Sequence, residues 1–383
     1  MKNKNKTIIH QITFSAIGGI QNSFIPFFKL NKFKSDFNHK IYGMHNIDPY
    51  FDEIKGSYVN FNNSLIEKFR FLFFIISRNY IVHFYNTLSS KKIRFILKFL
   101  PSNNIIFHER GSSWSAKTND FKTIKSNAKK ANIIIANSNA SKILLIKRFK
   151  IEKNKIKVIH NGFLSKKFKN LNFSRFSKNF SVGYIGRLDT PKGVHILIEA
   201  AKKLIDIDFF IAGDGILEKN LIFSAKGFNN IKFVGRARPI EFISKMDIMV
   251  FPSIREPLGN VIIESGFCEK AVIASDVDGI PDIIENGHNG ILLSPKNNLI
   301  YKNTPKSAVP IPDYVVNPRT KKLSKPKEID KIDLINSIKL LKRDKTKRID
   351  MGKKLYHTVK NYFSLEKYCK ELNNTYKNIL NEN

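Results

Sequence analysis

The chain has 383 residues, 42% of them hydrophobic, which is enough for packed interiors and for two domains of about 150–200 residues each. Two cysteines far apart exclude a disulfide framework and a cysteine-rich metal site, and the longest apolar run, residues 71–76, is too short for a membrane span of about 20 residues. The net charge is +34, and residues 1–170 hold 31 Lys/Arg against 8 Asp/Glu, so either the first half attracts anionic partners or the genome favours lysine.

Short apolar runs alternate with helical patterns through the first half of the chain. A strand over residues 7–14 leads into Gly18-Gly19, and a helix is predicted over residues 91–100. Further strands are predicted at residues 81–85, 105–108, 133–136 and 158–159. This alternation predicts βαβ units on a parallel sheet.

A second series of the same kind follows a break near residues 164–179, which is rich in Lys, Asn, Phe and Ser. Helices are predicted over residues 194–204 and from Asn260 onward. Strands are predicted at residues 181–185, 209–212, 231–234, 248–251 and 272–274. We therefore expect an α/β protein with two Rossmann-like, doubly wound domains facing across a cleft, where ligands bind outside the carboxyl ends of the strands.

The predicted domains cover residues 1–165 and 178–360, and residues 361–383 are expected to form a helix that crosses back to the first domain. Residues 295–331 carry six prolines among lysines and asparagines. Such a composition favours a loop or insertion rather than a core element.

The strongest motif spans residues 252–264, after the predicted strand at 248–251. Glu256 lies in the loop and Glu264 on the helix that opens near Gly259. Backbone N–H groups around Leu258, Gly259 and Asn260 would form a phosphate seat at the helix start, because the positive end of the helix dipole points there. The alternative is an ordinary helix start with two solvated glutamates.

The second motif spans residues 183–193, where Arg187 and Lys192 follow a strand that ends at Gly186. At the carboxyl edge of the sheet these cations would stabilise a departing diphosphate. No acidic cluster or Asp-x-Asp motif accompanies them, so we expect no metal and no other cofactor. The alternative is two ordinary surface cations in a lysine-rich chain.

Two weaker signals lie in the first half. Gly18-Gly19 closes the first strand, which a tight turn alone would also explain. His108 follows a strand end and would face the cleft, although a hydrogen-bonded structural histidine is the other interpretation. His83 is interpreted as structural.

Residues 181–293 resemble the C-terminal domain of the family 4 glycosyltransferases, which are retaining enzymes of the GT-B fold. The resemblance rests on short motifs that follow one another in the family's order: Gly186-Arg-Leu, Lys192-Gly, Ala212-Gly-Asp-Gly, Phe233-Val-Gly, Pro252-Ser, Glu256 to Glu264, Gly279-Ile-Pro-Asp and Asn289-Gly. A looser resemblance runs through the first half, at Gly18-Gly19, Ile81-Val-His, Phe107-His, Ala136-Asn-Ser and Val158-Ile-His-Asn-Gly.

The resemblance implies a role for each matching residue. Arg187 and Lys192 would hold the diphosphate, Glu264 the ribose hydroxyls and Glu256 the hydroxyls of the transferred sugar. The amides of residues 258–260 would complete the phosphate seat, Gly18-Gly19 would let the first domain approach the donor, and His108 would reach the sugar. Arg236 would lie beside the nucleobase.

Two features depart from the family pattern and bear on the acceptor side. Asp278 stands where the family often has glycine, and the insertion at 295–331 has no usual counterpart.

The predicted function is therefore transfer of a hexosyl-type sugar from a nucleotide diphosphate donor, with retention, to a lipid-linked or cell-surface polysaccharide acceptor. A nucleotide-sugar epimerase of the same fold is one alternative, and a catalytically silent partner subunit is another. A nucleic-acid-binding protein is disfavoured because the lysines are scattered and the two glutamates would be unexplained. We expect a cytoplasmic protein that is peripheral on an anionic membrane, since apolar and basic residues interleave at 69–76 and 91–100.

Overall fold

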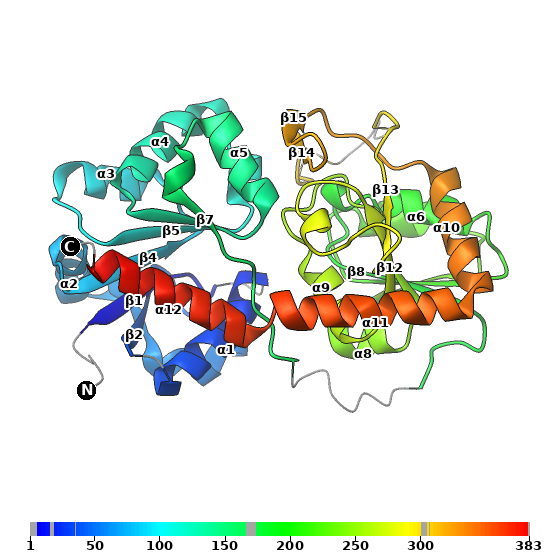
Figure 1. Ribbon diagram of the computed structural model, residues 1–383, viewed down its shortest axis with the longest axis horizontal. Helices are drawn as coiled ribbons and strands as arrows, with labels where there is room; N and C mark the ends of the chain where they lie inside the picture. The colour runs from blue at the N-terminus through cyan, green and yellow to red at the C-terminus, as the bar shows by residue number, and fades with distance from the viewer. Residues whose placement is uncertain are drawn as a thin grey trace. The chain divides into compact units, whose positions relative to one another are not determined.

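The computed structural model describes residues 6–15, 19–34, 36–165, 174–299, 305 and 307–381 (Figure 1). Contacts divide the chain into two compact units. The first unit comprises Met1–Leu164 with Ser364–Asn383, and the second unit comprises Ser165–Phe363. The sequence places the corresponding boundaries at residues 165, 178 and 361.

The first unit is built on a parallel sheet of seven strands in the order β3-β2-β1-β4-β5-β6-β7. The strands are short and mostly buried, as expected for a parallel sheet with helices on both faces. They are β1 (Thr7–Gln11), β2 (Asn38–Gly43), β3 (Tyr58–Asn60), β4 (Tyr80–Tyr85), β5 (Ile105–Glu109), β6 (Ile133–Ala136) and β7 (Ile156–Val158).

Helices connect these strands, and the C-terminal helix packs among them. The connecting helices are α1 (Gly19–Lys34), α2 (Leu65–Ile76), α3 (Lys91–Phe99), α4 (Phe121–Lys130) and α5 (Asn139–Phe149). Helix α12 (Leu365–Asn381) places Leu365, Tyr368, Leu372 and Tyr376 in the hydrophobic core of the first unit. Its start is fixed by a hydrogen bond from the Leu365 N–H to the Phe163 carbonyl (2.9 Å).

The second unit repeats this plan with six parallel strands in the order β10-β9-β8-β11-β12-β13. The strands are β8 (Ser181–Ile185), β9 (Asp208–Ala212), β10 (Ile231–Gly235), β11 (Ile248–Phe251), β12 (Ala271–Ser275) and β13 (Ile291–Leu293). The helices are α6 (Val194–Ala201), α7 (Glu218–Ser224), α8 (Pro239–Ser244), α9 (Asn260–Phe267), α10 (Lys331–Arg343) and α11 (Lys345–Tyr362).

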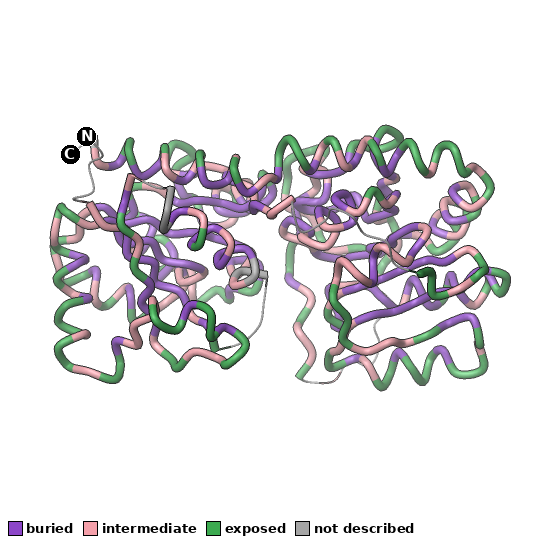
Figure 2. The backbone as a smooth tube through the Cα atoms, turned by 90° about the horizontal axis from the view of Figure 1, so that it is seen from below, coloured by how far each residue is buried: buried purple, intermediate pink, exposed green. Residues whose placement is uncertain are grey.

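The strand order reverses direction once in each sheet, between β1 and β4 in the first unit and between β8 and β11 in the second. At such a switch point the two loops leaving the carboxyl ends of the adjacent strands diverge and leave a crevice for a ligand. The predicted pair of Rossmann-like, doubly wound domains is confirmed. Figure 2 shows the buried strands inside each unit and the alternation of exposed and buried residues along the outer helices.

The predicted loop or insertion at residues 295–331 contains an antiparallel hairpin of β14 (Val315–Asn317) and β15 (Lys322–Ser324), which its prolines did not indicate. Val315 and Val316 are buried, at 4% and 0% exposure. All the prolines of this segment lie outside the two strands. The hairpin therefore keeps the N–H groups that its ladder needs, which proline inside a strand would remove.

Candidate active site

The loops that follow β8 and β11 are fastened together at the switch point of the second unit. The N–H groups of Ile254 and Arg255 both donate to the Pro191 carbonyl, at 2.9 and 3.1 Å. Gly193 has a φ of +64°, and a Cβ there would lie 2.1 Å from the Pro252 carbonyl oxygen. Only glycine fits this position, so the close approach of the two loops depends on it.

This approach brings two of the predicted site residues into contact. Lys192 ends a short 3₁₀ turn (Thr190–Lys192), and its ammonium group donates to the Glu256 carboxylate at 2.5 Å. The two side chains are only 23% and 15% exposed. A diphosphate that binds here would compete with Glu256 for the Lys192 ammonium group, and a sugar hydroxyl would compete with Lys192 for the Glu256 carboxylate. In the absence of a ligand, the ion pair therefore keeps these two side chains side by side.

Helix α9 begins where the sequence predicts, with Gly259 as its N-cap at a φ of +102° and Asn260 as its first residue. The N-cap Gly259 makes no side-chain cap hydrogen bond, and Leu258 is buried at 2% exposure just before it. A helix start beside a lysine has the electrostatics of an anion seat.

Glu264 lies on α9, just over one turn from its start, and is half-buried. Burial raises the pKa of Glu264 from 4.5 to about 8. No basic side chain forms an ion pair with it among the described residues. At pH 7 this carboxyl is largely protonated and can both donate and accept a hydrogen bond, as a pair of ribose hydroxyls would require.

The remaining predicted cations are solvent-exposed. Arg187 follows β8, and its backbone carbonyl accepts a hydrogen bond from the Tyr184 hydroxyl (3.0 Å). Arg236 follows β10, and its guanidinium donates to Asp214 at 2.7 Å, with side-chain exposures of 78% and 47%. An ion pair this exposed adds little stability, so Arg236 can leave Asp214 to contact a ligand. The nucleobase role of Arg236 stays a prediction.

Gly18 lies outside the described residues, and Gly19 is the first residue of α1. The Gln21 side-chain amide donates to the Thr13 carbonyl (2.8 Å), which ties the start of α1 to the loop after β1. The predicted role of the glycine pair stays a prediction.

His108 lies on β5 and is 1% exposed, with its ring stacked on His83 at 5.3 Å. His83 is fully buried, and its Nδ1 lies 2.9 Å from the Tyr376 hydroxyl, which confirms its structural interpretation. These rings belong to a group of four histidines in the first unit, with buried His10 and half-buried His39. A donor role for His108 stays a prediction, and its surroundings here are those of a core residue.

Two residues near the predicted motifs were missed from the sequence. The Asp189 carboxylate accepts from the Thr190 N–H (2.8 Å) and shapes the turn that carries Lys192; the signal was an aspartate directly before Thr-Pro, a typical cap pattern. Arg110 follows β5, is buried at 9% exposure and donates to the Ser23 hydroxyl (2.5 Å). Nothing in its local sequence distinguishes Arg110 from the other basic residues.

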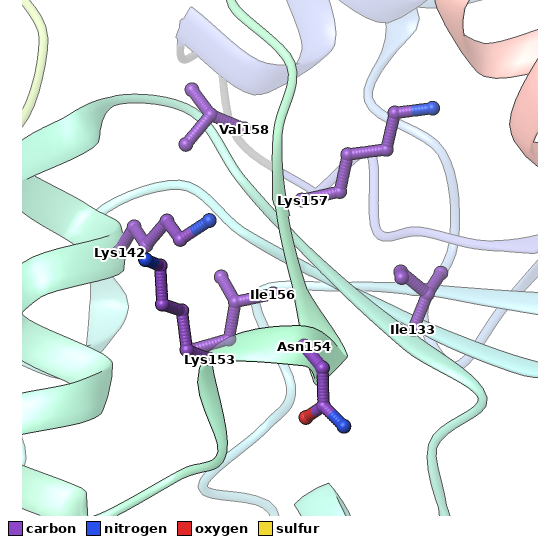
Figure 3. Close-up of a pocket in the computed structure, with 7 residues that line it drawn as sticks. All are labelled: Ile133, Lys142, Lys153, Asn154, Ile156, Lys157 and Val158. Carbon is purple, nitrogen blue, oxygen red and sulfur yellow. The ribbon is translucent and has the colours of Figure 1, made fainter.

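An open hollow of about 790 Å³ in the first unit contains none of the predicted site residues (Figure 3). It is lined by the β7 edge strand (Ile156, Lys157 and Val158), with Ile133, Lys142, Lys153 and Asn154 around it. Lysines beside an edge strand discourage pairing with another chain, so this hollow has a structural explanation.

Two absences hold for the described part of the chain. No group of three or more His, Cys, Asp or Glu side chains is arranged to hold a metal ion there. No helix in that part has the length and apolar character needed to span a bilayer.

Residues 179–301 match the sequence model of the family described as glycosyl transferases group 1. The match includes both loops of the switch point and α9, so Lys192, Glu256 and Glu264 all lie within the matched segment.

Similar proteins include two bacterial glycosyltransferases. The capsular polysaccharide biosynthesis glycosyltransferase CapM of Staphylococcus aureus is 30% identical over 182 residues, which are 45% of this chain and 45% of that protein. The N-acetylgalactosamine-N,N'-diacetylbacillosaminyl-diphospho-undecaprenol 4-alpha-N-acetylgalactosaminyltransferase of Campylobacter jejuni is 28% identical over 176 residues, 44% of this chain and 48% of that protein. The chain thus spans about half the length of the curated relatives it matches.

The whole chain is similar in fold to Anabaena Alr3699/HepE, whose crystal structure was solved in complex with UDP-glucose. The TM-score is 0.73 at 18% identity, and the comparison covers 97% of this chain and 99% of that chain. A likeness at this identity shows the fold, and the predicted GT-B fold is confirmed.

Proposed function

We propose that the protein transfers a sugar from a nucleotide diphosphate carrier to an acceptor hydroxyl, with retention of the anomeric configuration. The observation that carries this proposal is the Lys192–Glu256 pair at the switch point, a cation for a diphosphate beside a carboxylate for a sugar. The match of residues 179–301 to the model of the group 1 glycosyl transferases supports it. The solved fold relative binds UDP-glucose, so a UDP-sugar is the first donor to try.

In this mechanism the bond between the anomeric carbon and the diphosphate oxygen breaks while the acceptor oxygen bonds to the same carbon on the same face. The acceptor proton passes to the leaving diphosphate oxygen. Arg187, Lys192 and the start of α9 stabilise the negative charge that develops there, which supplies the leaving-group role without a metal ion. Glu256 orients the sugar through its hydroxyls.

Alanine variants of Glu264 and Glu256 test whether Glu264 binds the nucleotide and Glu256 binds the transferred sugar. Glu264→Ala should weaken nucleoside diphosphate binding by about tenfold or more, because it removes hydrogen bonds to the ribose. Glu256→Ala should keep that affinity and lower turnover at least about tenfold, because it removes contacts to the transferred sugar. Calorimetry with UDP and an assay of acceptor-dependent UDP release measure the two effects.

Glu285→Ala is the matched control, because Glu285 is an exposed glutamate of the same unit outside the switch point. It should change neither quantity. Unchanged nucleotide affinity in Glu264→Ala would contradict the ribose role, and release of UDP without any sugar transfer would contradict the reaction itself.

The proposed acceptor is a lipid-linked or cell-surface polysaccharide, and the proposed location is the cytoplasm at an anionic membrane surface. The two bacterial relatives are named for capsular polysaccharide biosynthesis and for transfer to a diphospho-undecaprenol-linked sugar. The first name refers to a capsular polysaccharide, and the second refers to a sugar linked to undecaprenol, which is a lipid. Residues 1–170 hold 31 basic and only 8 acidic residues, and this charge imbalance supports an anionic membrane surface as the partner.

Helices α2 and α3 support this location with an exposed set of apolar side chains. Those of α2 are Leu65 (69% exposed), Ile66 (70%), Phe69 (70%) and Phe73 (52%), and those of α3 are Phe95 (67%) and Phe99 (63%). Helix α3 also carries Lys91, Lys92, Arg94 and Lys98 and no acidic residue. Apolar side chains flanked by cations match the interface of an anionic bilayer, with the rings in the acyl boundary and the lysines among headgroups.

Vesicle flotation tests this surface, which we call the α2/α3 face. The protein should float with vesicles of phosphatidylcholine containing about one third phosphatidylglycerol and stay behind with phosphatidylcholine alone, since each basic residue near an anionic surface adds about 1 kcal/mol. Binding should weaken at high salt, because the Debye length shortens to about 3 Å at 1 M. Phe69→Ser with Phe95→Ser should reduce the bound fraction severalfold.

The matched control is Ile205→Ser with Phe223→Ser, which removes two apolar side chains of 76% and 77% exposure from the second unit. This pair should bind vesicles as the parent does. If the parent stays unbound on anionic vesicles at low salt, the membrane location is wrong and a soluble acceptor should be sought.

A further inference from the structure

We propose that Asp278 is a positioning residue that joins the segment of residues 305–324 to the sugar-binding loop, so that this segment helps to determine which donor sugar is accepted. The inference rests on the proposed function and extends it to a part of the chain that the family pattern does not supply. Residues 302–383 lie outside the part matched by the family model.

Asp278 holds Glu256 and the β14–β15 hairpin with one side chain. Its Oδ2 accepts from the Glu256 N–H (2.9 Å), and its Oδ1 accepts from the Val316 N–H (2.7 Å). The Asp278 N–H donates in turn to the Val316 carbonyl (3.1 Å). The carboxyl is buried at 2% exposure, where hydrogen bonds are strong and a lost partner is costly.

The backbone of Glu256 is fixed on its other side as well. Its carbonyl accepts from the Gly279 N–H (3.1 Å), and a Cβ at Gly279 would lie 2.1 Å from the Pro257 carbonyl oxygen. The loop that carries the proposed sugar-binding carboxylate therefore cannot shift independently of residues 278–279.

The same segment is attached at a second place in the site. The Val309 N–H donates to the Asp189 carboxylate (3.0 Å), which also shapes the turn of Lys192. A third bond runs from the Arg319 guanidinium Nε to Asp276 at 2.7 Å. Asp189 follows β8 and Asp276 and Asp278 follow β12, the two strands that flank β11 in the sheet. The segment is thus bonded on both sides of the loop that carries Glu256.

The backbone conformation of Asp278 allows a substitution that removes its hydrogen bonds to Glu256 and Val316 without straining the backbone. Its φ is +48°, in the left-handed region that glycine adopts without strain. Asp278→Gly therefore removes both carboxylate hydrogen bonds and should keep the backbone. Asp278→Asn keeps the size of the side chain and one oxygen acceptor, so it should restore part of the effect.

The test separates binding of the sugar from binding of the nucleotide. Asp278→Gly should leave UDP affinity within about twofold of the parent, weaken the preferred UDP-sugar by about tenfold, and reduce discrimination between UDP-sugars that differ at one hydroxyl, because one sugar contact is lost. Amide hydrogen exchange should accelerate at Glu256 and Val316. Asp278→Asn should fall between the parent and the glycine variant in each measurement.

Lys321→Gly is the matched control, since Lys321 lies in the turn of the same hairpin with a φ of +53° and is exposed. It should change neither sugar affinity nor exchange at Glu256. Equal weakening of UDP and UDP-sugar in Asp278→Gly, or unchanged discrimination with faster exchange, would overturn the inference. A parent that binds no nucleotide would instead contradict the proposed function.

Discussion

Lowering the pH from 7 to 5.5 should lower the unfolding free energy of the first unit, because the pKa values of four histidines in its folded state lie below the value of the unfolded chain. Burial lowers the pKa of His39 from 6.5 to about 4. Burial, with the neighbouring histidines as a further cause, holds the pKa of His10 well below 6.5. The pKa values of His83 and His108 are also well below 6.5, chiefly through burial.

The sign follows from which state binds the protons. In the unfolded chain each histidine titrates near 6.5, so below that pH the unfolded state takes up protons that the folded state does not. The unfolding free energy then falls with pH by up to about 1.4 kcal/mol per pH unit for each histidine. This stability is complete above pH 6.5 and is lost as the pH falls toward 4. Domains are typically stable by about 5–15 kcal/mol, so a loss of even about one or two kcal/mol in mild acid is measurable.

Trp114 provides the measurement, because it is the single tryptophan and is buried in the first unit at 1% exposure. Urea unfolding followed by its fluorescence at pH 7 and 5.5 gives the two free energies. Equal values at the two pH conditions would mean that the folded unit accepts these protons.

His108→Phe isolates the contribution of one ring. Neither ring nitrogen of His108 has a hydrogen-bond partner among the described residues, so phenylalanine should keep the stacking on His83 and lose no hydrogen bond. The variant should be at least as stable as the parent at pH 7 and should show a smaller dependence of stability on pH. His288→Gln, at an exposed histidine of the second unit, should leave the pH dependence seen by Trp114 unchanged.

Lys192→Ala should lower kcat by about 100-fold to 1000-fold, the range found when a group that stabilises developing negative charge is removed. Its ammonium group is only 23% exposed and lies 2.5 Å from the Glu256 carboxylate. Without the lysine the leaving diphosphate loses a cation and Glu256 loses the partner that holds it. Nucleoside diphosphate affinity should fall much less than kcat, because the charge to be stabilised grows during bond breaking.

Lys202→Ala is a closely matched control. Lys202 is 21% exposed and forms a 2.5 Å ion pair with Glu199, but it follows the far end of α6. It should leave kcat unchanged.

Measuring the parent with EDTA completes the test. Activity should survive in EDTA. Loss of activity in EDTA and its recovery with Mg²⁺ or Mn²⁺ would mean that a metal ion, and not Lys192, stabilises the leaving diphosphate.

Short sequence patterns predict much of the fold and part of the site. Runs such as Ile133–Ala136 and Ile248–Phe251 are apolar throughout and are strands in the structure with these same bounds. They follow the rule that strands of a covered parallel sheet are hydrophobic on both faces. Glycines and charged residues directly after such strands located Lys192, Glu256 and the start of α9, because in a parallel sheet loops after the strands share one edge.

Other features depend on partners that no local pattern can identify. The sequence of residues 105–108 predicts a strand, but whether His108 faces solvent or a core of three other histidines depends on β1, β2 and β4 beside it. The prolines of residues 295–331 predicted a loop, and only the ladder between β14 and β15 shows that two short stretches between them pair.

By itself the sequence determined the two doubly wound units, their alternating elements and the residue types at the carboxyl ends of β8 and β11. Tertiary structure alone decided which residues meet. Lys192 meets Glu256, 64 positions away in the sequence, and Asp278 meets Val316, 38 positions away. The physical reason is the range of the forces. Burial and backbone preference act on neighbouring residues and leave a periodic trace in the sequence, whereas a hydrogen bond between two loops requires only that the fold bring a donor and an acceptor within about 3 Å.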